Sequence, residues 1–155
     1  MSESAAEKKL RELGHELPPA PKPAGAYLTV IRSGNLVVTA GQLPWKGDKL
    51  LHAGKLGTQL TVQQGYEAAR QAGLNALAQI KACVGDLDKV KQILRLEGYV
   101  LCGPGFRDHP QVLNGCSELL NAVFGDKGRH TRTAVGIHEM PFDSPVQLIV
   151  WAEVE

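Results

Sequence analysis

A chain of 155 residues, 43% of them apolar and 21% charged, can bury the core of one globular domain. Its formal net charge of +1 gives no long-range field that would attract a polyanion, so we expect no nucleic-acid partner. No apolar run approaches the ~20 residues that span a bilayer, and the N-terminus lacks the charged-then-apolar order of a signal peptide. We therefore expect a cytoplasmic protein without membrane contact.

The first 24 residues predict a short helix followed by a connector. The helix is expected over Ala5 to Leu13, because Ser4 can cap its first amides and Gly14 suits the left-handed turn that ends a helix. The stretch 17–23 is rich in proline, which cannot donate backbone hydrogen bonds, so it should be extended. Residues 1–24 are thus predicted to be a peripheral appendage, and residues 25–155 the main domain.

The first half of the main domain predicts a hairpin and a long helix. Residues 27–32 and 36–40 are rich in β-branched side chains, and the Ser-Gly-Asn between them favours a tight turn. The polar, glycine-rich stretch 45–57 is expected to be a loop. Apolar residues between 61 and 83 recur at steps of three and four, and Gly85 can end the helix that this spacing predicts.

The second half predicts a central strand over residues 89–102, a helix over 110–124 and two closing strands. Asp108 is a candidate cap for that helix, and Pro110 suits its first turn. The element order predicts an α+β domain in which a mixed sheet carries both main helices on one face. The last strand contains Leu148, Val150 and Trp151 and is too apolar to be exposed to solvent on either face. This favours self-association.

One arginine stands out among the strand residues near the C-terminus. Arg132 opens an alternating run in which Ala134 and Gly136 share its face, because strand side chains repeat every second residue. Its planar guanidinium can hold a carboxylate through two parallel hydrogen bonds. From spacing alone, an arginine that pairs with a nearby acid or is solvated at a strand end is the favoured interpretation.

Cysteines and histidines indicate neither disulfides nor a metal site. The three cysteines lie in apolar patterns, which predicts buried free thiols in a reducing compartment. They are Cys83, Cys102 and Cys116. The histidines in the second half, His109, His130 and His138, lack paired-ligand spacing, and no phosphate-loop motif is present, so we expect no metal and no cofactor. His130 lies two residues before Arg132 and could contribute a proton on the same side of the strand.

The C-terminal segment from Arg132 to Trp151 is similar to the signature of the YjgF/RidA family, small trimeric proteins once called L-PSP endoribonucleases. Other matching stretches are residues 25–27 (GAY), 34–44 (GNLVVTAGQLP), 103–106 (GPGF), 112–115 (VLNG) and 124–125 (FG). The middle stretches resemble the branch of the family with longer chains. The likeness runs from about Tyr27 to Glu155.

This resemblance implies a chorismate-mutase-like fold and a homotrimer with three clefts between neighbouring subunits. In the family these clefts hydrolyse reactive enamine and imine acids, such as 2-aminoacrylate, to a 2-keto acid and ammonia without a cofactor. Arg132 would hold the substrate carboxylate, and Gly41 would let the backbone approach the ligand. The resemblance also assigns Tyr27 to the cleft wall and Asn114 to a supporting contact. A core aromatic and an ordinary helix polar residue are the alternatives for these two.

Several positions depart from the deaminase pattern. Ala40 stands where active members usually carry serine, and Ala134 where a cysteine is common, although both still line the implied cleft. Ile149 replaces the acid credited with activating water, and loss of a general base commonly costs ~10²–10⁴-fold in rate. Glu139 and Glu153 are candidate substitutes. The alternative function is a non-catalytic or differently specialised trimer that binds small carboxylates or partner proteins.

Overall fold

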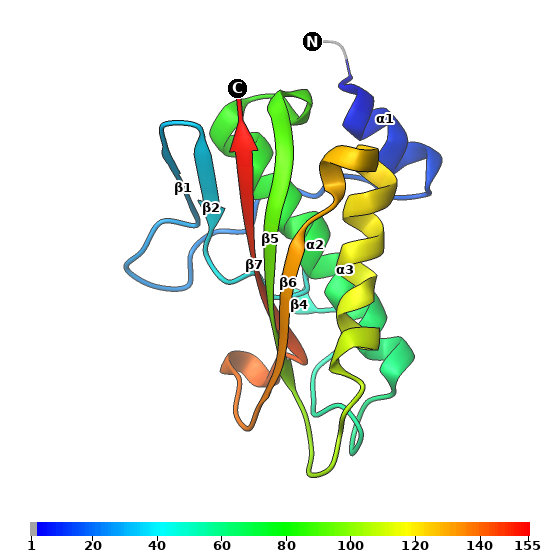
Figure 1. Cartoon of the computed structure of the whole chain (residues 1–155). Coiled ribbons are helices and arrows are strands. Elements are labelled where there is room, and N and C mark those ends of the chain that lie inside the picture. Colours follow the sequence, from blue (N-terminus) through cyan, green and yellow to red (C-terminus); the bar gives the residue numbers. More distant parts are fainter. Residues whose placement is uncertain (1–2) are drawn as a thin grey trace.

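A five-stranded mixed sheet forms the centre of the computed structural model, which describes residues 3–155 (Figure 1). The strand order is β1-β2-β7-β5-β6, with β5 and β6 parallel and every other neighbouring pair antiparallel. The strands are β1 (Val30–Ser33), β2 (Leu36–Thr39), β5 (Val90–Leu101), β6 (Thr131–Ile137) and β7 (Val146–Val154). The prediction of a mixed α+β domain is confirmed.

Two long helices cover one face of this sheet. They are α2 (Val62–Val84) and α3 (His109–Phe124), and both lie on the same side of the strands in Figure 1. The shorter α1 (Ala5–Glu12) packs against α3. Single 3-10 turns occur at η1 (Leu87–Lys89), η2 (Gly125–Gly128) and η3 (Pro141–Asp143). The opposite sheet face, which these helices leave uncovered, is called the open face below.

Local sequence signals explain where most of these elements begin and end. Thr61 and Gln64 form a reciprocal capping box at the start of α2, and Gly85 ends the helix with a φ of +88°. Gly34 takes a φ of +59° in the tight turn between β1 and β2. Asp108 lies at the N-cap position of α3, but its side chain makes no capping hydrogen bond, so that part of the prediction is wrong.

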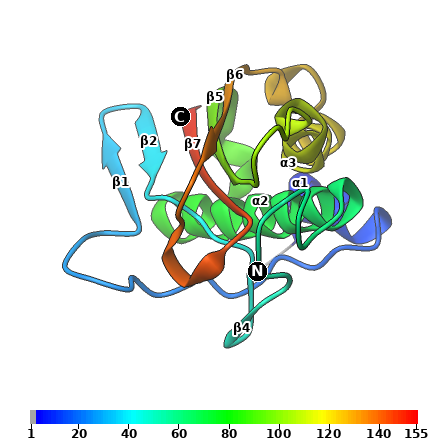
Figure 2. The ribbon, with the colours of Figure 1, turned by 90° about the horizontal axis from the view of Figure 1, so that it is seen from below.

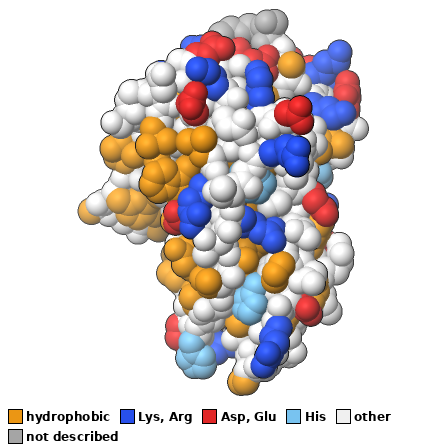
Figure 3. Space-filling model, in the orientation of Figure 1, with side chains coloured by type: hydrophobic (Ala, Val, Ile, Leu, Met, Phe, Trp, Pro, Cys, Tyr) orange, Lys and Arg blue, Asp and Glu red, His pale blue; other side chains and the backbone are white. Residues whose placement is uncertain are grey.

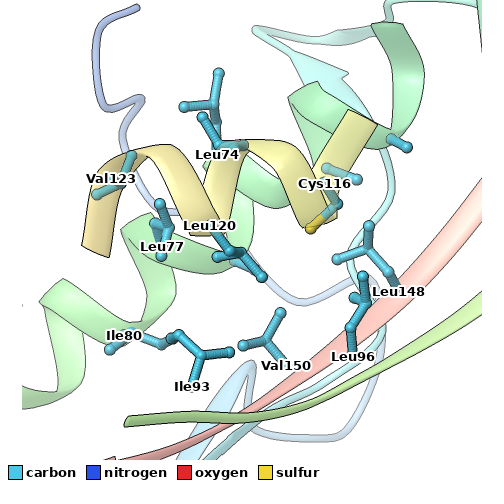
Figure 4. Packing of buried hydrophobic residues seen from close by; sticks show 14 of the residues in the cluster. Leu74, Leu77, Ile80, Ile93, Leu96, Cys116, Leu120, Val123, Leu148 and Val150 are labelled. Carbon is cyan, nitrogen blue, oxygen red and sulfur yellow. The ribbon is translucent and has the colours of Figure 1, made fainter. Parts of the chain in front are cut away.

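Leucine, isoleucine and valine side chains from the two main helices meet those of β5 and β7 in the core (Figure 4). Leu77, Ile80, Ile93, Leu96, Leu120, Leu148 and Val150 are all fully buried there. The helix-facing residues of β7 alternate with half-buried ones along the whole strand. This alternation fixes which side chains of β5, β6 and β7 are left on the open face.

Two segments differ from the sequence expectations. The stretch 45–57 is not all loop, because Trp45–Lys46 (β3) and Lys49–Leu50 (β4) pair as a short ribbon that projects from the fold (Figure 2). Helix α1 is more than an appendage, since Leu10 is 1% exposed. The Asp88 carboxylate accepts hydrogen bonds from the first backbone amides of α1 and so joins this helix to the main domain.

The open face begins with apolar side chains at the β1 edge. Leu28 and Ile31 are 70% and 56% exposed, and hydrophobic side chains gather over β1 and β2 in Figure 3. Such a patch is a typical interaction surface.

All three cysteines are free, but only Cys116 is fully buried, so the expectation of buried thiols is wrong for Cys83 and Cys102. No helix within residues 3–155 is both long and apolar enough to cross a membrane.

Candidate functional site

Arg132 lies on the edge strand β6 and points toward α3. It stands beside Leu96 of β5, on the helix side of the sheet, and its Nη1 donates to Asn114 Oδ1 at 2.8 Å and to Ser117 Oγ at 3.2 Å. These bonds use both hydrogens of Nη1. Within residues 3–155, Nε and Nη2 of Arg132 have no hydrogen-bond partner. They form the edge of the guanidinium that can take a carboxylate through two parallel hydrogen bonds.

No acid neutralises this arginine. Among the described residues, every ion pair of an arginine involves Arg11 or Arg95, so the alternative of an Arg132–acid pair is not what the structure contains. Arg132 is half-buried, and its two partners, an amide and a hydroxyl, are neutral. A half-buried cation with only neutral partners favours an anionic ligand, because each further hydrogen bond to a charged group contributes about 1.5–3 kcal/mol.

A chain of hydrogen bonds fixes the side chains behind Arg132. His130 Nδ1 lies 2.6 Å from the carbonyl oxygen of Gly128, and Nε2 lies 2.8 Å from Ser117 Oγ. Since a carbonyl only accepts, Nδ1 donates to Gly128, and Nε2 shares a hydrogen bond with the Ser117 hydroxyl. That hydroxyl in turn accepts from Arg132. His130 therefore orients Ser117, and through it the guanidinium.

The remaining β6 residues on this face are small. Ala134 packs partly buried against the core, and Gly136 leaves room for Cys102 and His109, whose Sγ and Nε2 atoms are 3.5 Å apart. The buried Cys116 lies behind them on α3. Burial raises the pKa of the Cys116 thiol to about 12, against the opposing effect of the Arg132 charge. Cys116 is thus a packing residue and not a nucleophile.

Tyr27, Ala40 and Gly41 lie together elsewhere, around a cavity of about 500 Å³. Tyr27 is half exposed, and its hydroxyl accepts from the backbone amide of Ala24 at 3.1 Å. A Cβ on Gly41 would overlap the side chain of Gln147, so glycine is needed here for close approach. Gln147, which stands where the family pattern favours a glutamate, also lines this cavity.

A transverse row of side chains runs across the open face next to this cavity. Ile149 of β7 lies opposite Glu97 of β5, and Glu97 lies opposite Thr133 of β6. The pairing of β2 with β7, continued two residues past Val38 and Trp151, places Ala40 beside Ile149. Directly opposed strand residues have Cβ atoms about 5 Å apart. The row therefore contains one acid, Glu97, which lies beside Ile149, the position where the family pattern has an acid.

Glu97 is better placed than either substitute considered from sequence. Its side chain is 22% exposed, and its Oε1 lies 3.3 Å from Nε of Arg95 on the same face. Glu139 is 77% exposed and lies outside the strands, near Lys55. Glu153 pairs with Lys91 at 3.3 Å, four residues beyond Ile149 along β7. Neither belongs to the row that Ala40 and Ile149 share with Glu97.

The predicted site residues thus form two groups in one chain. Arg132, Asn114 and Ala134 lie on the helix side of β6, whereas Tyr27, Ala40 and Gly41 lie by the end of β2. Three strand spacings separate β2 from β6, or roughly 14 Å. One small ligand cannot contact both groups within a single chain.

Within residues 3–155, no three His, Cys, Asp or Glu side chains cluster closely enough to hold a metal ion. His138 and Glu139 are both highly exposed and 4.0 Å apart.

The fold and the matching motifs define a chorismate-mutase-like domain, in which the guanidinium of Arg132 has a free edge for a ligand. The family model "YjgF/chorismate mutase-like, putative endoribonuclease" matches residues 7–154, and the chain belongs to this YjgF family. The resemblance found in the sequence is therefore confirmed.

Three similar proteins match over nearly their whole lengths. Protein TCP17 of Trypanosoma cruzi is 39% identical over 94% of this chain and 91% of its own length. The crystal structure of Atu1372 from Agrobacterium tumefaciens is 37% identical with a TM-score of 0.92, covering 97% of this chain and 93% of that one. The "putative endoribonuclease" from Shewanella oneidensis is 40% identical with a TM-score of 0.93, covering 96% and 99%. YjgF of E. coli, at 20% identity and a TM-score of 0.63, shares the fold.

Proposed function

We propose that this protein binds small 2-imino and 2-keto acids and hydrolyses reactive enamine and imine acids to 2-keto acids and ammonia. The observation that carries the proposal is the Arg132 guanidinium, which has two neutral partners and a free edge suited to a carboxylate. Nucleic-acid cleavage has little support, because the net charge is only +1 and cleavage would need a basic track for the phosphates.

The proposed site is a cleft between copies of the chain in a homotrimer. Arg132, Asn114 and Ala134 of one copy would face Tyr27, Ala40 and Gly41 of the next. Three features support this arrangement: the two groups are too far apart within one chain, β6 has an unpaired edge, and the open face carries exposed apolar side chains. An assembly would cover that face and complete each site at the same time.

The hydrolysis needs little from the protein besides correct positioning of the substrate and of the attacking water. Protonation of the enamine at its carbon and loss of a proton from its nitrogen give an imine, and water then adds to the C=N carbon while the nitrogen takes up a proton. Ammonia leaves as the carbonyl forms. Arg132 would hold the carboxylate and fix the electrophilic carbon in place. Glu97 would accept the proton of the attacking water, and the Gln147 amide would orient that water.

Ammonia release from freshly generated 2-aminoacrylate tests this proposal, with Arg132→Ala beside the wild type. Arg129→Ala is the matched control, because Arg129 is an exposed arginine in the preceding turn and lacks the Asn114 and Ser117 contacts. We expect the wild type and Arg129→Ala to accelerate hydrolysis and Arg132→Ala to lose the acceleration. If the wild type does not exceed the spontaneous rate, deamination of this substrate is excluded.

A second candidate function is carboxylate binding without turnover. The observation that favours it is the pair of apolar residues Ala40 and Ile149, which lie together where hydrolysis would benefit from polar groups. In that case calorimetry would detect pyruvate binding that depends on Arg132, while the rate of 2-aminoacrylate hydrolysis would stay at the spontaneous value.

A further inference from the structure

The cavity beside Gly41 has walls that are more aromatic than a small substrate needs. Tyr27, Trp45 and Phe142, called the aromatic walls below, come from the segment before β1, from β3 and from η3. The cavity measures about 500 Å³, within the range of pockets that enclose drug-sized ligands. The methylene group of 2-aminoacrylate would fill only a small part of it.

The aromatic walls are held in place by the surrounding backbone. Trp45 and Phe142 meet edge to face with ring centroids 5.2 Å apart, the geometry that aromatic pairs prefer. The carbonyl oxygen of Trp45 accepts hydrogen bonds from the Gln71 and Asn75 side chains of α2. The position of Trp45 is therefore set by the longest helix of the fold.

Phe142 is kept over the cavity in an unusual conformation. Its φ of +61° and that of Asp143, +55°, are the two positive values among the non-glycine residues described. Residues other than glycine rarely adopt this region, and such conformations persist where the surrounding structure enforces them. The amide of Gly54 donates to the Asp143 carbonyl at 2.7 Å, and the Ser144 hydroxyl donates to the Val146 carbonyl. Phe142 nevertheless leaves 58% of its surface exposed.

The rest of the cavity lining is partly polar. Gln42 donates to the Ala40 carbonyl and Gln79 donates to the Pro21 carbonyl, so both amides are already engaged within the chain. Among residues 3–155, the Gln147 side chain has one hydrogen-bond partner, the Met140 sulfur at 3.6 Å, so its amide oxygen is available for a ligand. Lys22 and Thr29 add a cation and a hydroxyl to the lining, so the aromatic walls stand beside polar groups, an arrangement that suits a ring or a large aliphatic group next to a polar centre.

We propose that the aromatic walls bind the side chain of the substrate, and that the preferred ligands are 2-imino and 2-keto acids with aromatic or large apolar side chains. This inference rests on the proposed function, because it leaves the carboxylate to Arg132 and the reacting carbon to the polar groups between. Specificity then comes from the apolar contact area. Burial of an aromatic side chain in place of a methyl group corresponds to a preference of roughly 10- to 100-fold.

Calorimetric titration with phenylpyruvate and pyruvate tests the inference, because both keto acids are stable and binding is measured without turnover. We expect the wild type to bind phenylpyruvate at least about tenfold more tightly than pyruvate. Phe142→Ala should bring the ratio of the two affinities close to one. Tyr27→Ala, which removes another of the aromatic walls, should also lower it. Leu13→Ala is the control, since Leu13 is exposed and lies outside the cavity.

The outcomes separate the two proposals. A wild-type ratio near one, with both acids bound, overturns the inference and leaves the proposed function standing. A high ratio that Phe142→Ala and Tyr27→Ala leave unchanged also overturns it, because the ring would then bind elsewhere. If neither acid binds, the proposed function fails and the inference fails with it. Each variant is compared with the wild type by size-exclusion chromatography, so that a change of assembly is not mistaken for a change of pocket.

Discussion

Arg132→Ala is the most decisive perturbation, and its size can be worked out from the contacts. The free edge of the guanidinium offers two charge-assisted hydrogen bonds, each contributing about 1.5–3 kcal/mol. Loss of both weakens ligand binding by about 3–6 kcal/mol, and every 1.4 kcal/mol is a factor of ten. We expect kcat/KM for imine hydrolysis to fall roughly 10²- to 10⁴-fold.

Arg132→Lys separates charge from geometry. Lysine keeps the positive charge but offers no planar pair of donors, so we expect it to recover only part of the loss. The assay is ammonia release at several substrate concentrations, with the fold of each variant checked by circular dichroism. The reasoning is refuted if folded Arg132→Ala keeps kcat/KM within about threefold of the wild type, since two hydrogen bonds to a carboxylate cannot contribute so little.

Four further outcomes are expected. Glu97→Gln should lower kcat about 10²-fold or more with little change in KM. Adding Ile149→Glu, one strand away in the same row, should restore part of the rate. An unchanged rate in Glu97→Gln would exclude this acid as the base. If the proposed trimer forms, assemblies refolded from equal amounts of Arg132→Ala and Glu97→Gln chains should recover about a quarter of the wild-type activity, because about one cleft in four then receives both intact residues; no recovery would count against a shared cleft. The pKa of the Cys116 thiol is raised in the folded state, so between about pH 9 and 12 the folded chain keeps a proton that the unfolded chain loses. The free energy of unfolding should therefore fall as pH rises through this window. Denaturant titrations of Cys116→Ala should lack this part of the pH dependence. Leu10→Ala should lower the free energy of unfolding by about 2–5 kcal/mol, and a melting temperature equal to that of the wild type would show that α1 is only an appendage.

The sequence predicts the long elements well because each carries its own local signal. The apolar period of α2 and the Thr61 cap lie within the segment that they define. The β3–β4 ribbon escaped prediction because strands of two residues show no alternation. The lack of a side-chain cap at Asp108 could not be foreseen either, since residue type does not report whether the side chain turns toward the helix.

The candidate site is harder to derive, because it depends on register between distant strands. Glu97 and Ile149 lie 52 positions apart in sequence and become neighbours only through the pairing of β5 with β7. Period-two counting gives the face of each strand but not which residues stand opposite one another. For that reason Glu139 and Glu153 were considered from sequence and Glu97 was not. Arg132 and Asn114, by contrast, were found through the family motif, and the structure brings them to 2.8 Å.

The sheet itself keeps the two charged groups of the proposed site apart. Arg132 points to the helix side of β6, whereas Glu97, on the neighbouring strand, points to the open face. In one chain they therefore cannot pair with each other, and Glu97 is paired with Arg95 instead. They can face the same ligand only where the open face of one copy meets the β6 edge of another. Such an arrangement links activity to assembly, since a separated chain would hold the carboxylate-binding arginine and the proposed base on opposite sides of its own sheet.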